Sequence, residues 1–188
     1  MMKSVSRFFR DGHGSKCPFL LLIIGSIVCT LIVLGLYFLR TSNVVEIIFN
    51  GDVVQTFPVE LESEMYIDYT HSVAKTNVRD VFVIKEDNSL VLTRTEYESF
   101  GAGLPTENYG SFEHIHGKYI NSGINVTFDE VPLRVGIIAN HRLTFQDGRG
   151  VVFSDLIEAG NLVIVKPNKV SRLKVLFIKG GMKIGQNE

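Results

Sequence analysis

The sequence predicts an all-β domain, an antiparallel β-sandwich or partly closed barrel, behind one N-terminal transmembrane helix. Two observations carry this prediction. Residues 18–39 are apolar and uncharged, and the rest of the chain is a series of short segments rich in Val, Ile, Phe and Tyr, separated by Gly, Asn and Asp. Outside the apolar stretch no segment keeps a helical period beyond two turns, residues 155–160 being the nearest. Many short strands joined by such turns are typical of sandwiches and barrels.

The apolar stretch at residues 18–39 is long enough to cross a membrane. Its 22 residues include 15 Leu, Ile, Val or Phe. As a helix it would span roughly 33 Å, against roughly 30 Å for the hydrocarbon core of a bilayer. The stretch lacks the shorter apolar run and the small-residue exit of a cleaved signal peptide, and the residues before Cys29 do not form a lipoprotein site. We therefore expect an uncleaved signal anchor in contact with the lipid bilayer.

The charges beside this stretch predict its orientation. Four bases and one acid precede it, and only Arg40 follows it closely. The positive-inside rule therefore predicts a single-pass protein of the cell membrane with its N-terminus in the cytoplasm. The 14 bases and 19 acids after residue 40 argue against nucleic acid as a partner. The expected parts are a cytoplasmic N-terminus (1–17), a transmembrane helix (18–39), an extracytoplasmic all-β domain (44–179) and a C-terminal tail (180–188).

The expected domain consists of short strands with recognisable turns. Asn50-Gly51 tolerates the positive φ angles of a tight turn, so the first two strands should form a hairpin. No internal repeat or long linker interrupts the series. The strands are expected at 44–50, 53–58, 64–70, 78–86, 89–97, 112–120, 124–129, 132–140, 141–146, 161–167 and 171–179.

One histidine, His71, stands in a stretch that otherwise resembles a core strand. If the segments on either side of a tight turn at 74–77 pair as a hairpin, His71 lies opposite Asp80, and Tyr69 lies opposite Phe82. Side chains alternate faces along a strand, so these pairs would share one largely apolar face. A carboxylate beside the imidazole would fix its orientation and protonation.

The pair His71–Asp80 has a structural and a functional interpretation. Half-buried polar pairs more often fix the register of strands than catalyse a reaction. Ser72 is adjacent, but neighbouring residues of a strand point to opposite faces, and the chain has no G-x-S-x-G elbow. We therefore predict no catalytic residue. A small exported enzyme that uses His71–Asp80 as an acid/base pair remains the alternative.

The predicted ligand or partner site is a shallow pocket beside this pair. The loop FGAGLP at 100–105 could close it, either as a cradle of backbone N–H groups or simply as a tight corner that needs glycine. His141 is a further candidate for its wall. The predicted site residues are His71, Ser72, Asp80, Phe100, Gly101, Gly103, His141 and Arg142.

Two further patterns carry weaker signals. His114 and His116 fall on one strand face and could bind zinc or copper, but a secure third ligand is lacking, so we predict no metal and no cofactor. Residues 166–183 contain six Lys or Arg and no acid. This basic segment could contact lipid headgroups or an acidic partner, or line a solvated strand face, which is commoner.

Several short motifs together resemble a known bacterial family. They are Tyr69-x-His71-Ser72-Val73, then Val78-x-Asp80-Val81, then the loop at 100–105, and the late His141-Arg142-Leu143. In combination they resemble domain of unknown function family 1850, small membrane-anchored proteins with one exported β-rich domain. The resemblance covers roughly residues 44–166. Ala74 and Asn77 replace what are often Glu and Pro in the family, so the turn after His71 can differ here.

The resemblance implies a role in solute uptake. Proteins of this family are typically encoded beside TAXI-type tripartite ATP-independent (TRAP) transporters, and no activity is established for them. It therefore implies that the chain is a membrane-tethered accessory or binding module. Its expected partners are the membrane subunit or the solute-binding protein of a TRAP transporter.

Overall fold

The computed structural model describes residues 18–99 and 110–179 and divides the chain into two compact units, 1–39 and 40–188. The first unit contains the helix α1 (Pro18–Leu39). From Phe19 to Leu39 this helix is long and apolar enough to cross a membrane, and it is the one such helix among the described residues. The predicted apolar helix is therefore confirmed.

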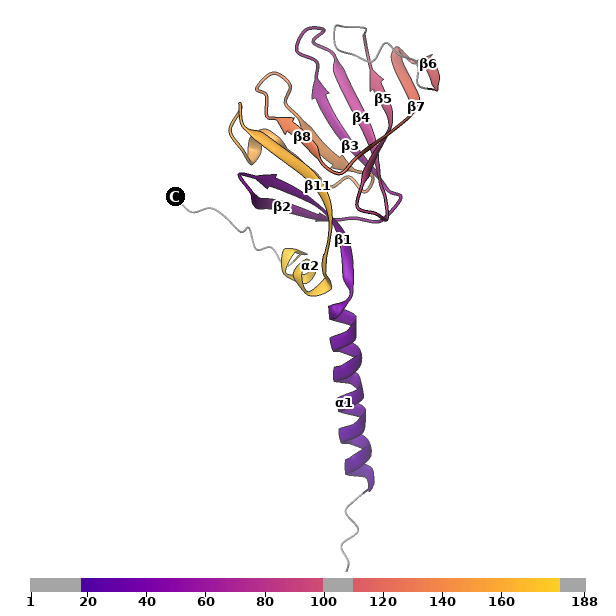
Figure 1. Cartoon of the computed structure of the whole chain (residues 1–188), viewed down its shortest axis with the longest axis vertical. Coiled ribbons are helices and arrows are strands. Elements are labelled where there is room, and N and C mark those ends of the chain that lie inside the picture. The colour runs from indigo at the N-terminus through magenta and orange to yellow at the C-terminus, as the bar shows by residue number, and fades with distance from the viewer. Residues whose placement is uncertain (1–17, 100–109, 180–188) are drawn as a thin grey trace, which may run out of the picture. The chain divides into compact units, whose positions relative to one another are not determined.

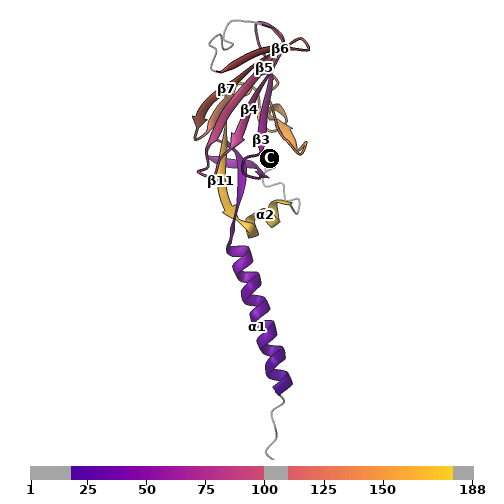
Figure 2. The ribbon, with the colours of Figure 1, turned by 90° about the vertical axis from the view of Figure 1, so that its right-hand side faces the viewer.

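The second unit contains two antiparallel sheets, and the all-β prediction in its sandwich form is confirmed. The smaller sheet has the strand order β2-β1-β11-β8 and the larger has the order β10-β9-β3-β4-β5-β7-β6. Figures 1 and 2 show the strands of this unit in two views. The strands are β1 (Thr41–Phe49), β2 (Asp52–Pro58), β3 (Glu64–Thr70), β4 (Asn77–Ile84), β5 (Leu90–Tyr97), β6 (Ser111–Ile115), β7 (Lys118–Phe128), β8 (Val131–Arg134), β9 (Arg142–Phe145), β10 (Gly150–Val152) and β11 (Leu162–Ser171).

The main core lies between the two sheets. It brings residues of the smaller sheet, such as Ile47 and Val165, into one apolar cluster with Ile67 and Leu143 of the larger sheet. The 3-10 helix η1 (Phe153–Asp155) adds Phe153, which is fully buried. Strand β6 contributes nothing to this core, because every one of its residues is exposed. The larger sheet therefore extends beyond the part that the main core covers.

The first hairpin has the predicted turn. Asn50 and Gly51 have φ angles of 52° and 88° between β1 and β2. Only residues that tolerate the left-handed region fit there without strain. This local signal was therefore sufficient to place the hairpin.

Two predicted strands are wrong. Residues 112–120 do not form one strand, because the positive φ angles of His116 and Gly117 make a hairpin turn between β6 and β7. Residues 171–179 are largely helical: after Ser171 the chain forms the helix α2 (Arg172–Lys179). The alternating polar and apolar residues at its start imitate a strand, but Leu, Lys and Arg are also good helix formers.

Other boundaries also differ from the expectation. The predicted strand at 132–140 ends at Arg134, and a turn closed by the N–H of Asn140 and the carbonyl of Gly136 follows. The short strand β10 was not predicted. Residues 161–167 extend through Ser171 as the long strand β11, which pairs with β1 on one side and β8 on the other.

Candidate functional site

The predicted register between β3 and β4 is wrong by four residues. Asp80 lies opposite Ile67, not opposite His71, and Tyr69 lies opposite Val78. The reason is the length of the turn, since β3 ends at Thr70 and the loop occupies residues 71–76. The shift is even, so the residues keep the faces that the sequence assigned to them. The predicted pairing of His71 with Asp80 does not exist.

His71 instead organises the turn that follows β3. Its N–H donates to the carbonyl of Thr76 at 2.9 Å, and its carbonyl accepts from the N–H of Lys75 at 2.9 Å. Its ring Nδ1 accepts from the N–H of Ala74 at 3.1 Å. The imidazole therefore caps the loop as a local acceptor, which explains a histidine at this position without any catalytic role.

Asp80 is half-buried on the inner face of the larger sheet. Its carboxylate accepts a hydrogen bond of 2.8 Å from the hydroxyl of Thr95, which is 2% exposed. Burial raises the pKa of Asp80, hydrogen bonds from Thr95 and Tyr69 oppose that rise, and the nearby charge of Asp68 adds to it. A carboxyl group held in a position where burial disfavours its charged form is a candidate functional group.

Tyr69 links Asp80 to His141. Burial raises the pKa of the Tyr69 hydroxyl, and the charge and hydrogen bonding of Asp80 raise it further, so the hydroxyl stays protonated and acts as a donor. The rings of Tyr69 and His141 lie 5.5 Å apart between centroids. Asp80 and His141, both predicted site residues, therefore meet through a residue that the prediction did not include. We call Tyr69, Asp80, Thr95 and His141 the Tyr69 cluster.

His141 has a buried ring nitrogen that no described residue bonds. Its Nδ1 is buried and has no hydrogen-bond partner among residues 18–99 and 110–179. Burial lowers the pKa of the imidazole, so the ring is held in its neutral form. A neutral imidazole nitrogen and a fixed carboxylate can orient a polar ligand. The hydroxyl of Thr95 contacts Asp80, but Thr95 is only 2% exposed, so this hydroxyl is not placed to attack a bound substrate.

Aromatic side chains continue the inner face next to this cluster. Tyr97 of β5, which is 1% exposed, stacks with Tyr119 of β7 at 5.8 Å between ring centroids. His114 of β6 stacks against the same Tyr119 at 4.4 Å between ring centroids. His116 lies in the turn after β6 with a positive φ angle. Among the described residues no group of three His, Cys, Asp or Glu could hold a metal ion.

Two linked turns at this end of the sheet expose large apolar side chains. Val73 is 70% exposed, Ile137 is 84% exposed and Ile138 is 58% exposed. The N–H of Thr70 donates to the carbonyl of Ala139 at 2.8 Å and so joins the two turns. We call Val73, Ile137 and Ile138 the apolar tip. Single exposed apolar residues are ordinary, but three in adjoining turns are typical of an interaction surface.

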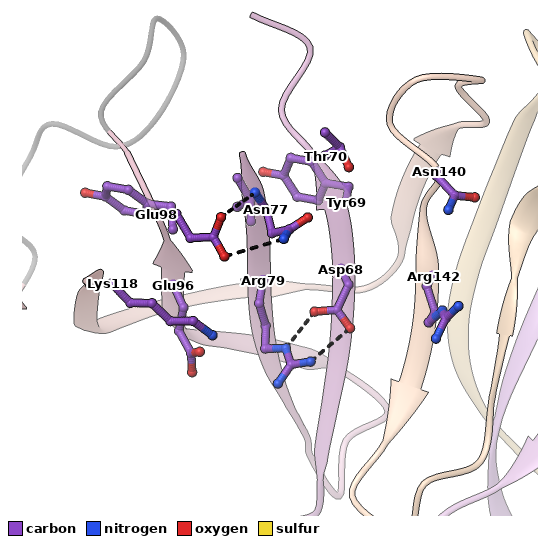
Figure 3. Close-up of a pocket in the computed structure, with 12 residues that line it drawn as sticks. Asp68, Tyr69, Thr70, Asn77, Arg79, Glu96, Glu98, Lys118, Asn140 and Arg142 are labelled. Carbon is purple, nitrogen blue, oxygen red and sulfur yellow. Dashed lines mark hydrogen bonds and ion pairs between the residues drawn. The ribbon is translucent and has the colours of Figure 1, made fainter. Parts of the chain in front are cut away.

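The outer face of the same strands carries a polar hollow of about 330 Å³. Figure 3 shows charged side chains along it. They include residues of β3, β4, β5, β7 and β9. Arg79 donates to Asp68 at 2.6 and 3.2 Å, and the predicted site residue Arg142 lies opposite Asp68 on the neighbouring strand. The three acids and three bases of the lining are Asp68, Glu96, Glu98, Arg79, Lys118 and Arg142. Their charges balance, so the hollow selects no ligand of one sign.

The predicted site residues therefore divide into four groups. Asp80 and His141 lie together in the Tyr69 cluster. His71 and Ser72 lie in the adjoining turn, and Arg142 lies on the opposite face of the sheet. Phe100, Gly101 and Gly103 lie outside the described residues.

The prediction omitted Tyr69 and Thr95 as site residues. The predicted register placed Tyr69 among the core residues. A tyrosine two positions before His71 could nevertheless have indicated a polar group at the site. Thr95 had no such signal, because its contact with Asp80 depends on the pairing of β4 with β5. Ile137 and Ile138 were assigned to a strand, so their exposure was not predicted.

One known family matches the part of the chain that holds these residues. Residues 65–150 match the family model named Domain of unknown function (DUF1850). The chain resembles this family. The match runs from β3 to the start of β10 and contains the Tyr69 cluster and the apolar tip. No curated protein and no solved structure matches the chain significantly.

Proposed function

We propose that this protein is a membrane-tethered, extracytoplasmic binding module that supports a TRAP-type solute uptake system. One observation carries the proposal: the apolar tip exposes Val73, Ile137 and Ile138 beside the half-buried polar groups of the Tyr69 cluster. Exposed apolar side chains in adjoining turns can form the apolar centre of a protein-binding surface, and neighbouring polar groups can form its rim.

The helix α1 supplies the tether. Its length and composition suit a membrane span, and a single residue, Arg40, separates its end from β1. The basic residues before the span favour a cytoplasmic N-terminus and an exported domain. A module on so short a tether works at the membrane surface, where the subunits of a transporter are within reach.

The Tyr69 cluster favours binding over catalysis. The Tyr69 hydroxyl is held protonated and the imidazole of His141 is held neutral. The hydroxyl of Thr95 donates to Asp80, but Thr95 is only 2% exposed and so is closed to a substrate. The cluster therefore suits the positioning of a partner's polar atoms better than nucleophilic attack.

The partner class comes from the family resemblance. Proteins that resemble this chain are typically encoded beside TAXI-type TRAP transporters, so the membrane subunit and the solute-binding protein of such a transporter are the partners to test. The apolar tip is the surface proposed to contact them.

Site-specific photocrosslinking tests the proposal. A photoreactive amino acid at Ile137 in the full chain, expressed with the candidate transporter, should crosslink to one of its subunits. The same group at Leu162, which is 49% exposed on the smaller sheet, is the matched control. Crosslinks of equal yield from both positions, or none from Ile137, would contradict the proposed surface.

A further inference from the structure

The short helix α2 has one face that the domain holds and one that it leaves open. On the held face, Val175 is 9% exposed and packs in a small cluster with Val44 and Val170. Lys174 pairs through Nζ with Oε1 of Glu46 at 3.2 Å, and Glu46 is itself buried. These contacts fix the rotation of the helix about its axis.

The open face of α2 is apolar. Leu173, Leu176 and Phe177 are 47%, 56% and 59% exposed. Their spacing of three and four residues places them on one side of a helix. An eight-residue helix of a water-soluble domain normally turns such a side to the core. Here the core side is already occupied by Lys174 and Val175, so the apolar side needs another cover.

The start of α2 adjoins the point where the chain leaves the membrane span. The N–H of Arg172 donates to the carbonyl of Arg40 at 2.9 Å, and Ser171 pairs with Thr41 at the end of β11 and the start of β1. Arg40 directly follows Leu39, the last residue of α1. The first residue of α2 is thus hydrogen-bonded to the residue that follows the span.

The charge around α2 suits an anionic lipid surface. The segment from 166 to 183 contains six Lys or Arg and no acid. Of these bases, Lys166 pairs with Glu130 at 3.0 Å and Lys174 pairs with Glu46, so their charges are matched within the domain. Lys169, Arg172 and Lys179 are the further bases in the described part of the segment. An apolar helix face beside basic residues is the usual composition of a helix that lies in the interface of a bilayer.

We propose that α2 lies in the headgroup region of the bilayer that α1 spans, with Leu173, Leu176 and Phe177 inserted toward the acyl chains. The helix then acts as a second, lateral membrane contact. It fixes the tilt and rotation of the domain on its anchor and so decides which surface of the domain faces a partner in the same membrane. This inference rests on the membrane anchoring of α1 but not on the transporter partner.

Fluorescence quenching in vesicles tests the placement of α2. The full chain, with Cys17→Ala and Cys29→Ala, is labelled with an environment-sensitive fluorophore at Phe177→Cys and reconstituted in vesicles of phosphatidylcholine and phosphatidylglycerol. Matched labels at Ile137→Cys, exposed elsewhere on the domain, and at Val33→Cys in α1 are the controls. We expect a lipid with a shallow nitroxide to quench the Phe177 label several-fold more than the Ile137 label, and iodide to quench it several-fold less.

Each result has a defined meaning. Iodide quenching of the Phe177 label equal to that of Ile137 overturns the proposal. Protection from iodide without quenching by the nitroxide lipid also overturns it, because a second copy or another protein then covers the helix. Loss of nitroxide quenching in pure phosphatidylcholine vesicles supports the role of the basic residues, whereas unchanged quenching supports insertion through the apolar face alone.

The anchor and α2 can fail separately. If the Val33 label is not quenched by a lipid with a deep nitroxide, α1 does not span the bilayer and the proposed tether is wrong. If the Val33 label is quenched and the Phe177 label is not, the anchor holds and only the placement of α2 is wrong.

Discussion

The main core and the Tyr69 cluster are built on the same strands, but they are completed in different ways. On β3, Ile67 is 1% exposed and faces the smaller sheet as part of the main core. Two residues later on the same face, Tyr69 is only half-buried and contacts Asp80 and His141. One face of one strand thus passes from the main core to the polar Tyr69 cluster within a single repeat of the pleat.

We infer that the part of the sheet in the main core serves stability and that the part with the Tyr69 cluster serves interaction. The main core has apolar groups on both sides, so its burial stabilises the fold directly. The Tyr69 cluster keeps a carboxyl whose pKa burial raises and is bordered by exposed apolar turns. Such a region keeps a carboxyl group at an electrostatic cost, which is typical of sites that serve binding.

The largest expected effect separates the core from the apolar tip. Leu143→Ala should reduce the free energy of unfolding by about 2–5 kcal/mol, because Leu143 is 0% exposed and the change leaves a cavity. Ile137→Ala should change it by less than about 0.5 kcal/mol, because that side chain is 84% exposed. Denaturant unfolding of the full chain in detergent micelles measures both. Similar losses for the two variants would refute the division between core and tip.

A smaller effect should distinguish the Tyr69 cluster from ordinary surface. Thr95→Val keeps the volume of the buried side chain but removes the hydroxyl that donates to Asp80. We expect a loss of roughly 1–3 kcal/mol at neutral pH, the cost of leaving a buried acceptor without its donor. Thr127→Val, on an exposed position of β7, is the matched control and should change stability little. An equal effect of the two substitutions would show that the hydrogen bond adds nothing.

The fold could be predicted from local sequence patterns, whereas the site depends on which residues of different strands lie opposite one another. The continuous apolar stretch at 18–39 was sufficient to predict α1, and the Asn50-Gly51 turn was sufficient to predict the first hairpin. The pairing of β3 with β4 was not determined by local pattern, because the even shift of four residues leaves the same side chains on the same face. Only the turn geometry of His71 decides between the two registers, through hydrogen bonds that the sequence does not reveal.

The C-terminal error has a different cause. The segment RLKVLFIK alternates over its first four residues and so resembles a strand, while Leu173, Leu176 and Phe177 also satisfy a helical period. The sequence does not show which residues would cover either pattern, so it does not decide between a strand and a helix. In the structure Lys174 of the helix contacts Glu46, a residue 128 positions away that the local sequence cannot reveal.

The smallest expected effect is a pH dependence that belongs to the Tyr69 cluster alone. Because the pKa of Asp80 is raised in the folded protein above its ordinary value of 3.8, the folded state binds the proton more tightly than the unfolded state. The contribution of Asp80 to stability should therefore fall as pH rises from about 4 through its raised folded pKa.

Asp80→Asn removes this ionisation and keeps an oxygen that can accept from Thr95. The variant should gain free energy of unfolding relative to the original chain as pH rises from about 4 to 7, whatever its stability at the acidic end. The contribution of His141, which burial gives the opposite slope, is common to both proteins and cancels in the difference. Asp52→Asn on the exposed start of β2 is the control for the loss of one charge. A difference for Asp80→Asn that rises with pH no more than that of this control, or that falls with pH, would mean that the carboxyl is not held at a cost and that the Tyr69 cluster is ordinary polar packing.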